Sequence, residues 1–399
     1  MTDIKPITAT EELAGAVQAS IADEVDEPRS AGTLPWIIGG LAVVVILGSA
    51  AWFLAEYVPI WTKGTSLSWL GTIEYPVYAI IFGLLGNAVL SVLNLRDRLS
   101  PGFRTEFLIK TGLVLLGASI NFAIIVKAAA PAIAQATLLI TSVFFITWWL
   151  GRLFGLDARL RALLSSAVSI CGVSAAIAAA GAVKAKKEDL AYTASLVIIF
   201  ALPSIFVLPW LAGLLGLTDA QTGAWIGGNI DTTAAVTAAG SIAGEAPLQI
   251  AAIVKSTQNA LLGVAAVLLT VFFAYKIDRK PGEAAPTASL FWQRFPKFVL
   301  GFLVASIIAT IFVNSVGSQA AAPLIGTANN LRTWFLTFAF VSIGLELKVS
   351  SLRRAGWRPI AVFALATVAN LVIGLALAHL LWSGFEIPAW SADNAMARW

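Results

Sequence analysis

The stretch IGGNIDTTAAVTAAG, at residues 226–240, places a single carboxylate among glycines, hydroxyl side chains and alanines. Strongly apolar sequence flanks it on both sides. The adjacent glycines Gly227 and Gly228 favour an unwound backbone just before Asp231. A charged side chain at membrane depth is costly unless it is paired or hydrated, and it usually marks a functional site. The stretch therefore predicts an interrupted helix with a polar centre.

The composition around this stretch indicates a membrane protein. Of 399 residues, 58% are hydrophobic and only 12% are charged, whereas a soluble domain is typically about 25% charged. Apolar runs long enough to cross a bilayer recur along the chain. We therefore expect an all-α polytopic membrane protein with about eleven hydrophobic segments, at about 36–58, 73–94, 107–126, 129–151, 162–183, 190–216, 223–241, 248–275, 294–316, 329–350 and 357–382.

The charges divide the chain into three parts. Residues 1–34 are acidic and predict a disordered cytoplasmic tail, residues 35–382 form the transmembrane transporter domain, and residues 383–399 form a short C-terminal tail. Basic residues gather in alternate loops, which by the positive-inside rule places the N-terminus in the cytoplasm and the C-terminus in the periplasm of a bacterial inner membrane. These short basic loops orient the protein in lipid and do not indicate a nucleic-acid partner.

A second stretch, SICGVSAAIAAAG at residues 169–181, has the same small and hydroxyl character. GVSAAIAAAGAV (172–183) resembles DTTAAVTAAGSI (231–242), and GLVLLGASINF (112–122) resembles FVSIGLELKVS (340–350). Inverted repeats whose interrupted helices meet near the bilayer midplane are the plan of many secondary transporters. The sequence therefore predicts inverted repeats with two interrupted helices.

The path of the two interrupted segments is left open by the sequence. The basic clusters at 152–161 and 184–187 flank the same segment, and both have cytoplasmic character. About 22 residues make either one crossing of roughly 33 Å or two arms of about 15 Å each. Length fits both a crossing helix and a re-entrant hairpin, and the charges slightly favour hairpins.

The candidate site lies between the two polar turns. We expect a small anionic substrate there, because unwound turns offer free amides and helix N-termini favour negative charge. Asp231 would bind a proton or Na⁺, or would neutralise a nearby lysine. The expected substrate-binding residues are Ser169, Cys171, Gly172, Ser174, Gly228, Asn229, Thr232, Thr233, Lys255 and Gln258, and the expected ion-coupling residues are Asp231, Asn121 and Glu346.

Soluble catalytic motifs are missing from the sequence. It holds no Walker loop, no H-E-x-x-H and no nucleophile elbow. One cysteine and one histidine exclude a disulfide framework and a histidine-rich metal site. We expect no enzyme and no cofactor, apart from Na⁺ or H⁺ as a coupling ion, and the sequence is compatible with a homodimer.

The same residues resemble a known family. GLVLLGASI (112–120), SICGVSAAIAAAGAVKAKKED (169–189), the G-x-x-D-T-T-A-A-V-T-A-A-G region (228–240) and AAIVKSTQN (251–259) are similar to the bacterial sulfate exporter family of YeiH-like membrane proteins, over about residues 70–380. The resemblance implies membership of the cation/proton antiporter and anion transporter superfamily, with crossing interrupted helices. The family usually has His–Glu in place of Asp231-Thr232 and often arginine in place of Gln258, so we expect a change of substrate or coupling ion there.

The function expected from these observations is secondary active transport. The chain would move sulfate, sulfite or an organosulfonate by alternating access. A Na⁺- or H⁺-coupled carrier of organic acids and a cation/proton antiporter are the alternatives within transport. A channel or a membrane receptor is the alternative outside it.

Overall fold

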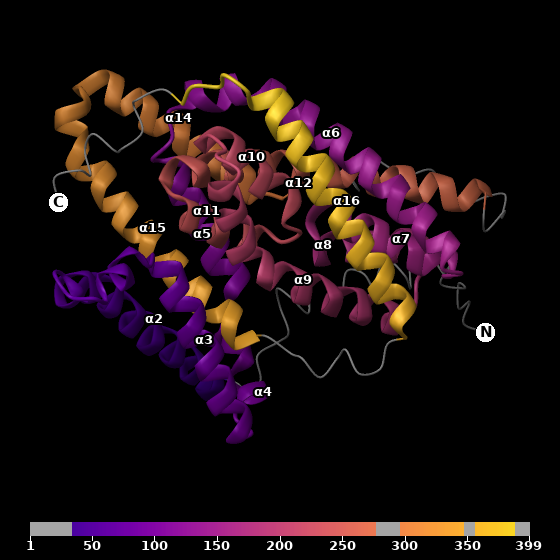
Figure 1. Cartoon of the computed structure of the whole chain (residues 1–399), viewed down its shortest axis with the longest axis horizontal. Coiled ribbons are helices and arrows are strands. Elements are labelled where there is room, and N and C mark those ends of the chain that lie inside the picture. Colours follow the sequence, from indigo (N-terminus) through magenta and orange to yellow (C-terminus); the bar gives the residue numbers. More distant parts are fainter. Residues whose placement is uncertain (1–33, 277–295, 347–355, 388–399) are drawn as a thin grey trace, which may run out of the picture.

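Residues 34–276, 296–346 and 356–387 are described by the computed structural model, and every regular element in these ranges is helical. The N-terminal tail expected at 1–34 therefore lies almost wholly outside the described residues. Only residues 383–387 of the expected C-terminal tail lie within them. Figure 1 shows two groups of helices that meet along one boundary.

The first group, which we call the scaffold bundle, packs α15 against α3, α5 and α2, with α14 beside α5. The backbones of α3 and α15 approach closely at Gly83, where a Cβ would lie only 2.2 Å from the carbonyl oxygen of Val341. Arg96 donates to the carbonyl oxygens of Leu345 and Glu346 and so caps the end of α15. The group consists of α2 (Leu34–Thr62), η1 (Ser68–Thr72), α3 (Tyr75–Val92), α4 (Arg96–Leu99), η2 (Ser100–Gly102), α5 (Thr105–Gly117), α14 (Phe298–Val316) and α15 (Ser318–Glu346).

The second group, which we call the hairpin bundle, surrounds the long helix α12. Helices α6 and α16 run side by side along its outer face (Figure 1). The group consists of α6 (Phe122–Leu153), α7 (Ala158–Ser166), η3 (Ala167–Cys171), α8 (Val173–Val183), α9 (Lys187–Leu214), α10 (Asp219–Asn229), α11 (Thr233–Ala243), α12 (Glu245–Lys276) and α16 (Trp357–Trp382).

The first interrupted segment folds back on itself. Arg159, near the start of α7, donates from Nε to the carbonyl oxygen of Val183, the last residue of α8, at 2.9 Å. The two short helices therefore lie side by side as a re-entrant hairpin. The reversal is a wide π turn, η3, followed by Gly172 at a φ of 64°, a conformation that glycine adopts without steric cost.

The second interrupted segment is also a hairpin. A Cβ on Gly227 of α10 would lie 2.9 Å from the Cα of Ala251, and one on Gly240 of α11 would lie 3.5 Å from the Cβ of Ala251. Both arms thus pass the same point of α12. The reversal ends at Thr232, whose hydroxyl caps α11 by accepting from the amide of Ala235 at 3.1 Å. The crossing helices implied by the family resemblance are therefore wrong, and the hairpin interpretation describes both segments.

The two hairpins enter the bundle from opposite ends. Leu248, near the start of α12, packs beside Gly240 of the second hairpin, while Phe273, near its end, packs on Ala162 and Val183 of the first. The tips meet between these levels, where a Cβ on Gly172 would lie 3.0 Å from the carbonyl oxygen of Asp231. The sequence stretches that predicted breaks are therefore the two hairpin tips.

Seven helices in the described ranges are long and apolar enough to cross a membrane, namely α2, α3, α6, α9, α12, α14 and α16. The expectation of about eleven spanning segments is not confirmed. Two of the eleven are hairpins of short arms, and α5 has only 13 residues. Helix α15 has 29 residues and includes the buried polar residues Asn329 and Arg332. The predicted internal repeat stays a prediction.

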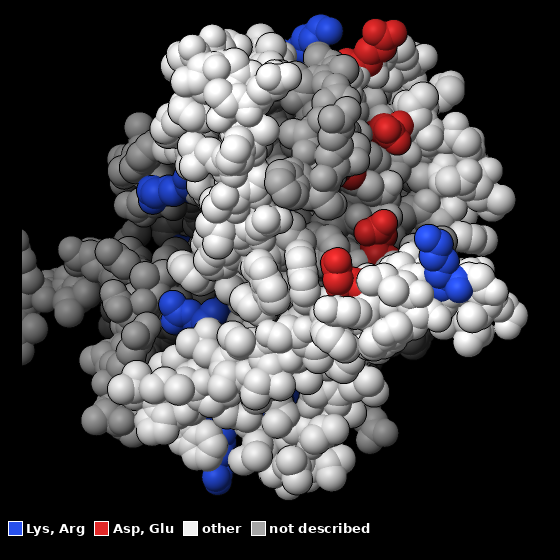
Figure 2. Space-filling view, turned by 90° about the vertical axis from the view of Figure 1, so that its left-hand side faces the viewer, with Lys and Arg blue, Asp and Glu red and all other residues white. Residues whose placement is uncertain are grey.

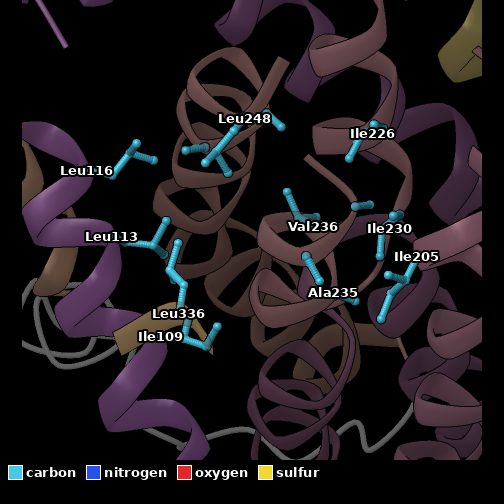
Figure 3. Packing of buried hydrophobic residues seen from close by; sticks show 14 of the residues in the cluster. Ile109, Leu113, Leu116, Ile205, Ile226, Ile230, Ala235, Val236, Leu248 and Leu336 are labelled. Carbon is cyan, nitrogen blue, oxygen red and sulfur yellow. The ribbon is translucent and has the colours of Figure 1, made fainter. Parts of the chain in front are cut away.

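The boundary between the bundles is filled by apolar side chains around α11. Figure 3 shows Ala235 and Val236 of α11 between the scaffold residues Ile109, Leu113, Leu116 and Leu336 and the hairpin-bundle residues Ile205, Ile226 and Ile230. In Figure 2 most of the visible described surface is uncharged, with a few separate Lys, Arg, Asp and Glu side chains. An apolar exterior suits a lipid environment.

Candidate functional site

Lys255 of α12 lies behind the two hairpin tips and is only 1% exposed. Its ammonium donates to the carbonyl oxygen of Ile170 at 2.6 Å and to Gln258 Oε1 at 3.0 Å. Gln258 in turn donates from Nε2 to the carbonyl oxygen of Gly228 at 3.0 Å. The turns leave these two carbonyls free of helical partners, and α12 therefore joins the first tip to the second.

Asn370 of α16 joins the tips a second time. Its Nδ2 donates to the carbonyl oxygen of Val168 at 3.2 Å and to that of Asn229 at 3.1 Å. We call Lys255, Gln258 and Asn370 the tip clamp. All three side chains are buried, and each donates to at least one backbone oxygen near a helix break, so the clamp satisfies groups that the breaks expose.

Asp231 lies at the second tip and is 5% exposed. Across the described ranges, its carboxylate has no hydrogen-bond or ion-pair partner. The Lys255 ammonium donates to Ile170 and Gln258 and forms no salt bridge with Asp231, but the two opposite charges are close enough to interact electrostatically. The alternative in which Asp231 neutralises this lysine stays a prediction. A buried carboxylate that forms no hydrogen bond or salt bridge is costly for folding, which favours a role in binding a proton or cation.

A cavity of about 730 Å³ lies at the boundary between the bundles and reaches the hairpin tips. From the tips, Cys171, Ser174, Thr232 and Thr233 line it, joined by Asn259 of α12. The scaffold contributes residues from α5, α14 and α15, and α9 contributes an apolar strip. The cavity thus has walls from both bundles.

Two helices begin at this cavity. Val173 is the first residue of α8 and Thr233 the first of α11, each helix having 11 residues, and both line the cavity. Their positive dipole ends and first-turn amides favour negative charge. Asn259 donates from Nδ2 to the Thr233 hydroxyl at 3.1 Å, while its Oδ1 is buried without a partner. These groups make a polar end to the cavity.

The structure distributes the predicted substrate-binding residues over two places. Cys171, Ser174, Thr232 and Thr233 line the cavity, and Gly172 lies at the tip between them. Ser169 donates instead to its own helix, at the carbonyl oxygen of Ser165. Gly228, Asn229, Lys255 and Gln258 lie within the tip clamp and its contacts. Substrate binding by each of them stays a prediction.

The predicted ion-coupling residues are not brought together. Asn121 caps α6 by accepting from the amide of Ala123 at 2.9 Å. Glu346 lines the cavity at the end of α15, together with Glu106 and Lys110 of α5, which form an ion pair at 3.1 Å. The described residues include no group of three His, Cys, Asp or Glu side chains that could hold a metal ion. A Na⁺ site at Asp231 stays a prediction.

An ion pair that the sequence reasoning missed joins the two bundles. Arg332 of α15 binds Glu245 of α12 through both guanidinium nitrogens, at 2.6 and 3.0 Å, and both side chains are largely buried. Beside it, Tyr75 of α3 donates to Ser241 of α11 at 3.4 Å. We call these four residues the latch. Arg332 precedes the cavity residue Glu346 by fourteen residues, or about 21 Å along α15 at about 1.5 Å per residue.

Comparison with known proteins identifies relatives over most of the chain. The family model described as "Conserved hypothetical protein 698" matches residues 39–363. A UPF0324 membrane protein of Rhodopirellula baltica is 36% identical over 337 residues, which is 83% of this chain and 62% of the relative. Two UPF0324 membrane proteins of Nitratidesulfovibrio vulgaris are 35% identical over 315 residues and 33% identical over 310 residues, each over 76% of this chain.

These relatives differ in length. The chain covers 54% of the first Nitratidesulfovibrio vulgaris relative and 82% of the second. It therefore spans little more than half the length of some relatives and most of the length of others. No solved structure matches the chain.

Proposed function

The chain belongs to the UPF0324 membrane protein family, and from that premise we propose that it is a secondary active transporter. It carries a small anion, of the class of sulfate, sulfite or an organosulfonate, across the bacterial inner membrane by alternating access. The observation that carries the proposal is the cavity at the boundary of the two bundles, into which two helix N-termini open.

Anion binding is supported by the lining of the cavity. The first turns of α8 and α11 offer backbone amides, and Ser174, Thr232 and Thr233 offer hydroxyl groups. Lys255 provides a buried positive charge behind the tips without occupying the cavity. Discontinuous helices that point their N-termini at an anionic group are a recurring arrangement in secondary transporters.

Alternating access is supported by how the two bundles meet. Helix α11, which lies at the boundary, is built largely from small residues, including Ala234, Ala235, Ala238 and Ala239, and small residues allow neighbouring helices to approach closely. The latch closes the boundary at the level of the base of the second hairpin, and the cavity opens it at the other end. Breaking the latch while closing the cavity would end access to the hairpin tips from the cavity end and open access from the latch end.

The orientation of this state follows from the basic residues. Lys110 and Lys297 line the outer part of the cavity, and Arg159 and Lys184 lie at the base of the first hairpin. By the positive-inside rule, this end faces the cytoplasm. The cavity is then open to the cytoplasm, and the latch closes the periplasmic side.

The buried carboxylate of Asp231, which forms no salt bridge, favours an ion-coupled mechanism. It lies beside the cavity-lining residue Thr232 and near Gly172 of the opposite tip. Binding of H⁺ or Na⁺ there would neutralise a charge that otherwise opposes movement of the hairpin bundle through a low-dielectric boundary. The same carboxylate favours a cation/proton antiporter as the second candidate function.

Counterflow in proteoliposomes tests the proposal. Vesicles that contain the purified protein and a high internal concentration of unlabelled sulfate or sulfite should accumulate the labelled anion, and the rate should saturate. Flux without counterflow would indicate a channel and contradict the proposal. Flux of H⁺ or Na⁺ that needs no anion would establish the antiporter instead.

A further inference from the structure

We propose that the substrate of this cavity is an amphipathic organic anion, a singly charged sulfonate or carboxylate with an apolar body, and that bare sulfate is not the preferred cargo. The inference rests on the transport function proposed above. It names the substrate class from the size, the lining and the charges of the cavity.

The cavity is large for an inorganic oxyanion. Its volume of about 730 Å³ lies within the usual range for sites that bind organic ligands, about 300–1,000 Å³. Sulfate has five non-hydrogen atoms and would fill a small part of this space. An anion with a chain of several carbon atoms matches the volume better.

Much of the lining outside the hairpin tips is apolar. Helix α9 contributes Ile198, Leu202 and Ile205, and the facing helices contribute Ile109, Leu262 and Ile343. Hydrocarbon side chains cannot replace the water lost by a fully hydrated dianion, so they oppose its binding. They favour an apolar body, because burying hydrocarbon surface stabilises the complex in proportion to the area removed from water.

At the polar end of the cavity, the side-chain amide of Asn259 is not fully hydrogen-bonded. Asn259 is 5% exposed, lines the cavity, and has an Oδ1 without a partner. The Thr233 hydroxyl that it contacts can both accept and donate, so the Asn259 amide can turn over and offer N–H to an anion while keeping that contact. Together with the N-termini of α8 and α11, this amide places a negatively charged headgroup at the tips.

The charges around the cavity favour one negative charge over two. The carboxylates of Glu106 and Glu346 line it together with the ammonium groups of Lys110 and Lys297, and Asp231 lies beside Thr232 at the tip. The Lys110 ammonium is paired with Glu106, and Lys255 donates to Ile170 and Gln258. The lining therefore has two acidic and two basic side chains and offers no surplus positive charge to balance the second charge of a dianion.

Binding to a chain-length series tests the inference. The unfolding temperature of the purified full-length protein is titrated with sulfate, methanesulfonate, butanesulfonate and hexanesulfonate, and with butyl methyl sulfone as an uncharged probe. We expect affinity to rise about fourfold for each added methylene that is buried. The uncharged sulfone should bind much more weakly than butanesulfonate, because it lacks the charge that the helix N-termini favour.

Two variants test whether the sulfonates of the chain-length series bind in this cavity. Leu202→Thr should flatten the dependence on chain length and leave methanesulfonate unchanged, whereas Thr233→Val should weaken all sulfonates by a similar factor. Val207→Thr is the matched control on α9, because Val207 is 43% exposed and does not line the cavity. The series on the unaltered protein is decisive even if a variant does not fold.

The outcomes separate this inference from the proposed function. Sulfate binding as tightly as hexanesulfonate, with counterflow of sulfate, would overturn the organic substrate and keep the transporter. Equal binding of the sulfone and butanesulfonate would overturn recognition of the charge. An absence of binding by any of these anions, together with an absence of anion counterflow, would overturn both proposals.

Discussion

The boundary between the two bundles is built differently at its two ends. At one end the latch holds α15 to α12 with a doubly bonded ion pair, and Tyr75 contacts Ser241 beside it. At the other end the helices part around a cavity of about 730 Å³ whose outer lining includes Glu106, Lys110 and Glu346. Between them lie the hairpin tips.

Under the proposed transport function, this difference would make the structure one of two access states. A symmetric boundary would offer no preferred direction of opening. Here an ion pair must break before the latch end can open, and the cavity must collapse before its own end can close. In the proposed mechanism, movement of the hairpin bundle against the scaffold would do both at once, as alternating access requires.

The largest expected effect comes from removing the charge of Asp231, which lies at the hairpin tips between the latch and the cavity. Asp231→Asn keeps the shape of the side chain and removes the charge, and we expect transport to fall to background in proteoliposomes. The unfolding temperature of the variant is measured beside the flux, so that a loss of transport is distinguished from a loss of the fold.

Asp219→Asn is the matched control for this change. Asp219 lies in the first turn of the same hairpin and is exposed. This variant should transport normally. Transport by Asp231→Asn at the parent rate would remove the coupling role of Asp231.

Breaking the latch should have the next largest effect. Arg332→Met leaves the Glu245 carboxylate buried without its cation, and removing one partner of a buried pair typically costs about 3–5 kcal/mol. Chemical denaturation of the purified protein measures this loss.

The double variant Arg332→Met/Glu245→Met distinguishes a latch from a packing contact. It should recover most of the lost stability, since neither charge is then unpaired, but it should shift the protein toward the state that opens at the latch end. If stability recovers and the cavity is accessible from each side of the membrane as in the parent protein, the ion pair only supports the fold.

A smaller effect is expected at the tip clamp. Asn370→Leu leaves the carbonyl oxygens of Val168 and Asn229 without the donor that Asn370 supplies, and each unsatisfied buried group costs about 1–3 kcal/mol. Thr367→Val on the same helix is the control, because the Thr367 hydroxyl donates only to its own helix at Phe363. Equal denaturation midpoints for the two variants would argue against a clamp.

The sequence predicted the places where the fold is unusual better than the paths between them. Glycines and hydroxyl residues located both tips, but only Gly172 lies in a turn. The prediction that Gly227 and Gly228 unwind the backbone is wrong, because both lie inside α10, close against α12 and α6, and the break comes after Asn229. Hairpin and crossing could not be separated, since segments of this length satisfy either path. The contact that decides it, Arg159 with Val183, joins residues 24 apart and leaves no local pattern.

The candidate site was predicted only in part, because some of its residues have a local sequence signal and others do not. Asp231 and the cavity-lining Thr232 and Thr233 stand out as polar residues in apolar sequence. The partner of Lys255 did not, because it is a backbone carbonyl that exists as a free acceptor only at a helix break. Asn370 was missed although a lone Asn in an apolar span is a usable signal. Arg332 was missed although it lies within the predicted segment 329–350, because its partner Glu245 is 87 residues away and leaves no local pattern.

The central claim, that the cavity alternates between the two sides of the membrane, is tested most directly at Ser174. The chain has one cysteine, Cys171, so Ser174→Cys in a Cys171→Ala background places a single thiol at an exposed position in the cavity. Its reaction with a membrane-impermeant maleimide is measured in right-side-out and in inside-out vesicles. The account predicts reaction from both sides, slower in the presence of a transported anion, and faster from the latch side in the Arg332→Met/Glu245→Met background. Reaction from one side only, in every background and with every anion, would contradict it.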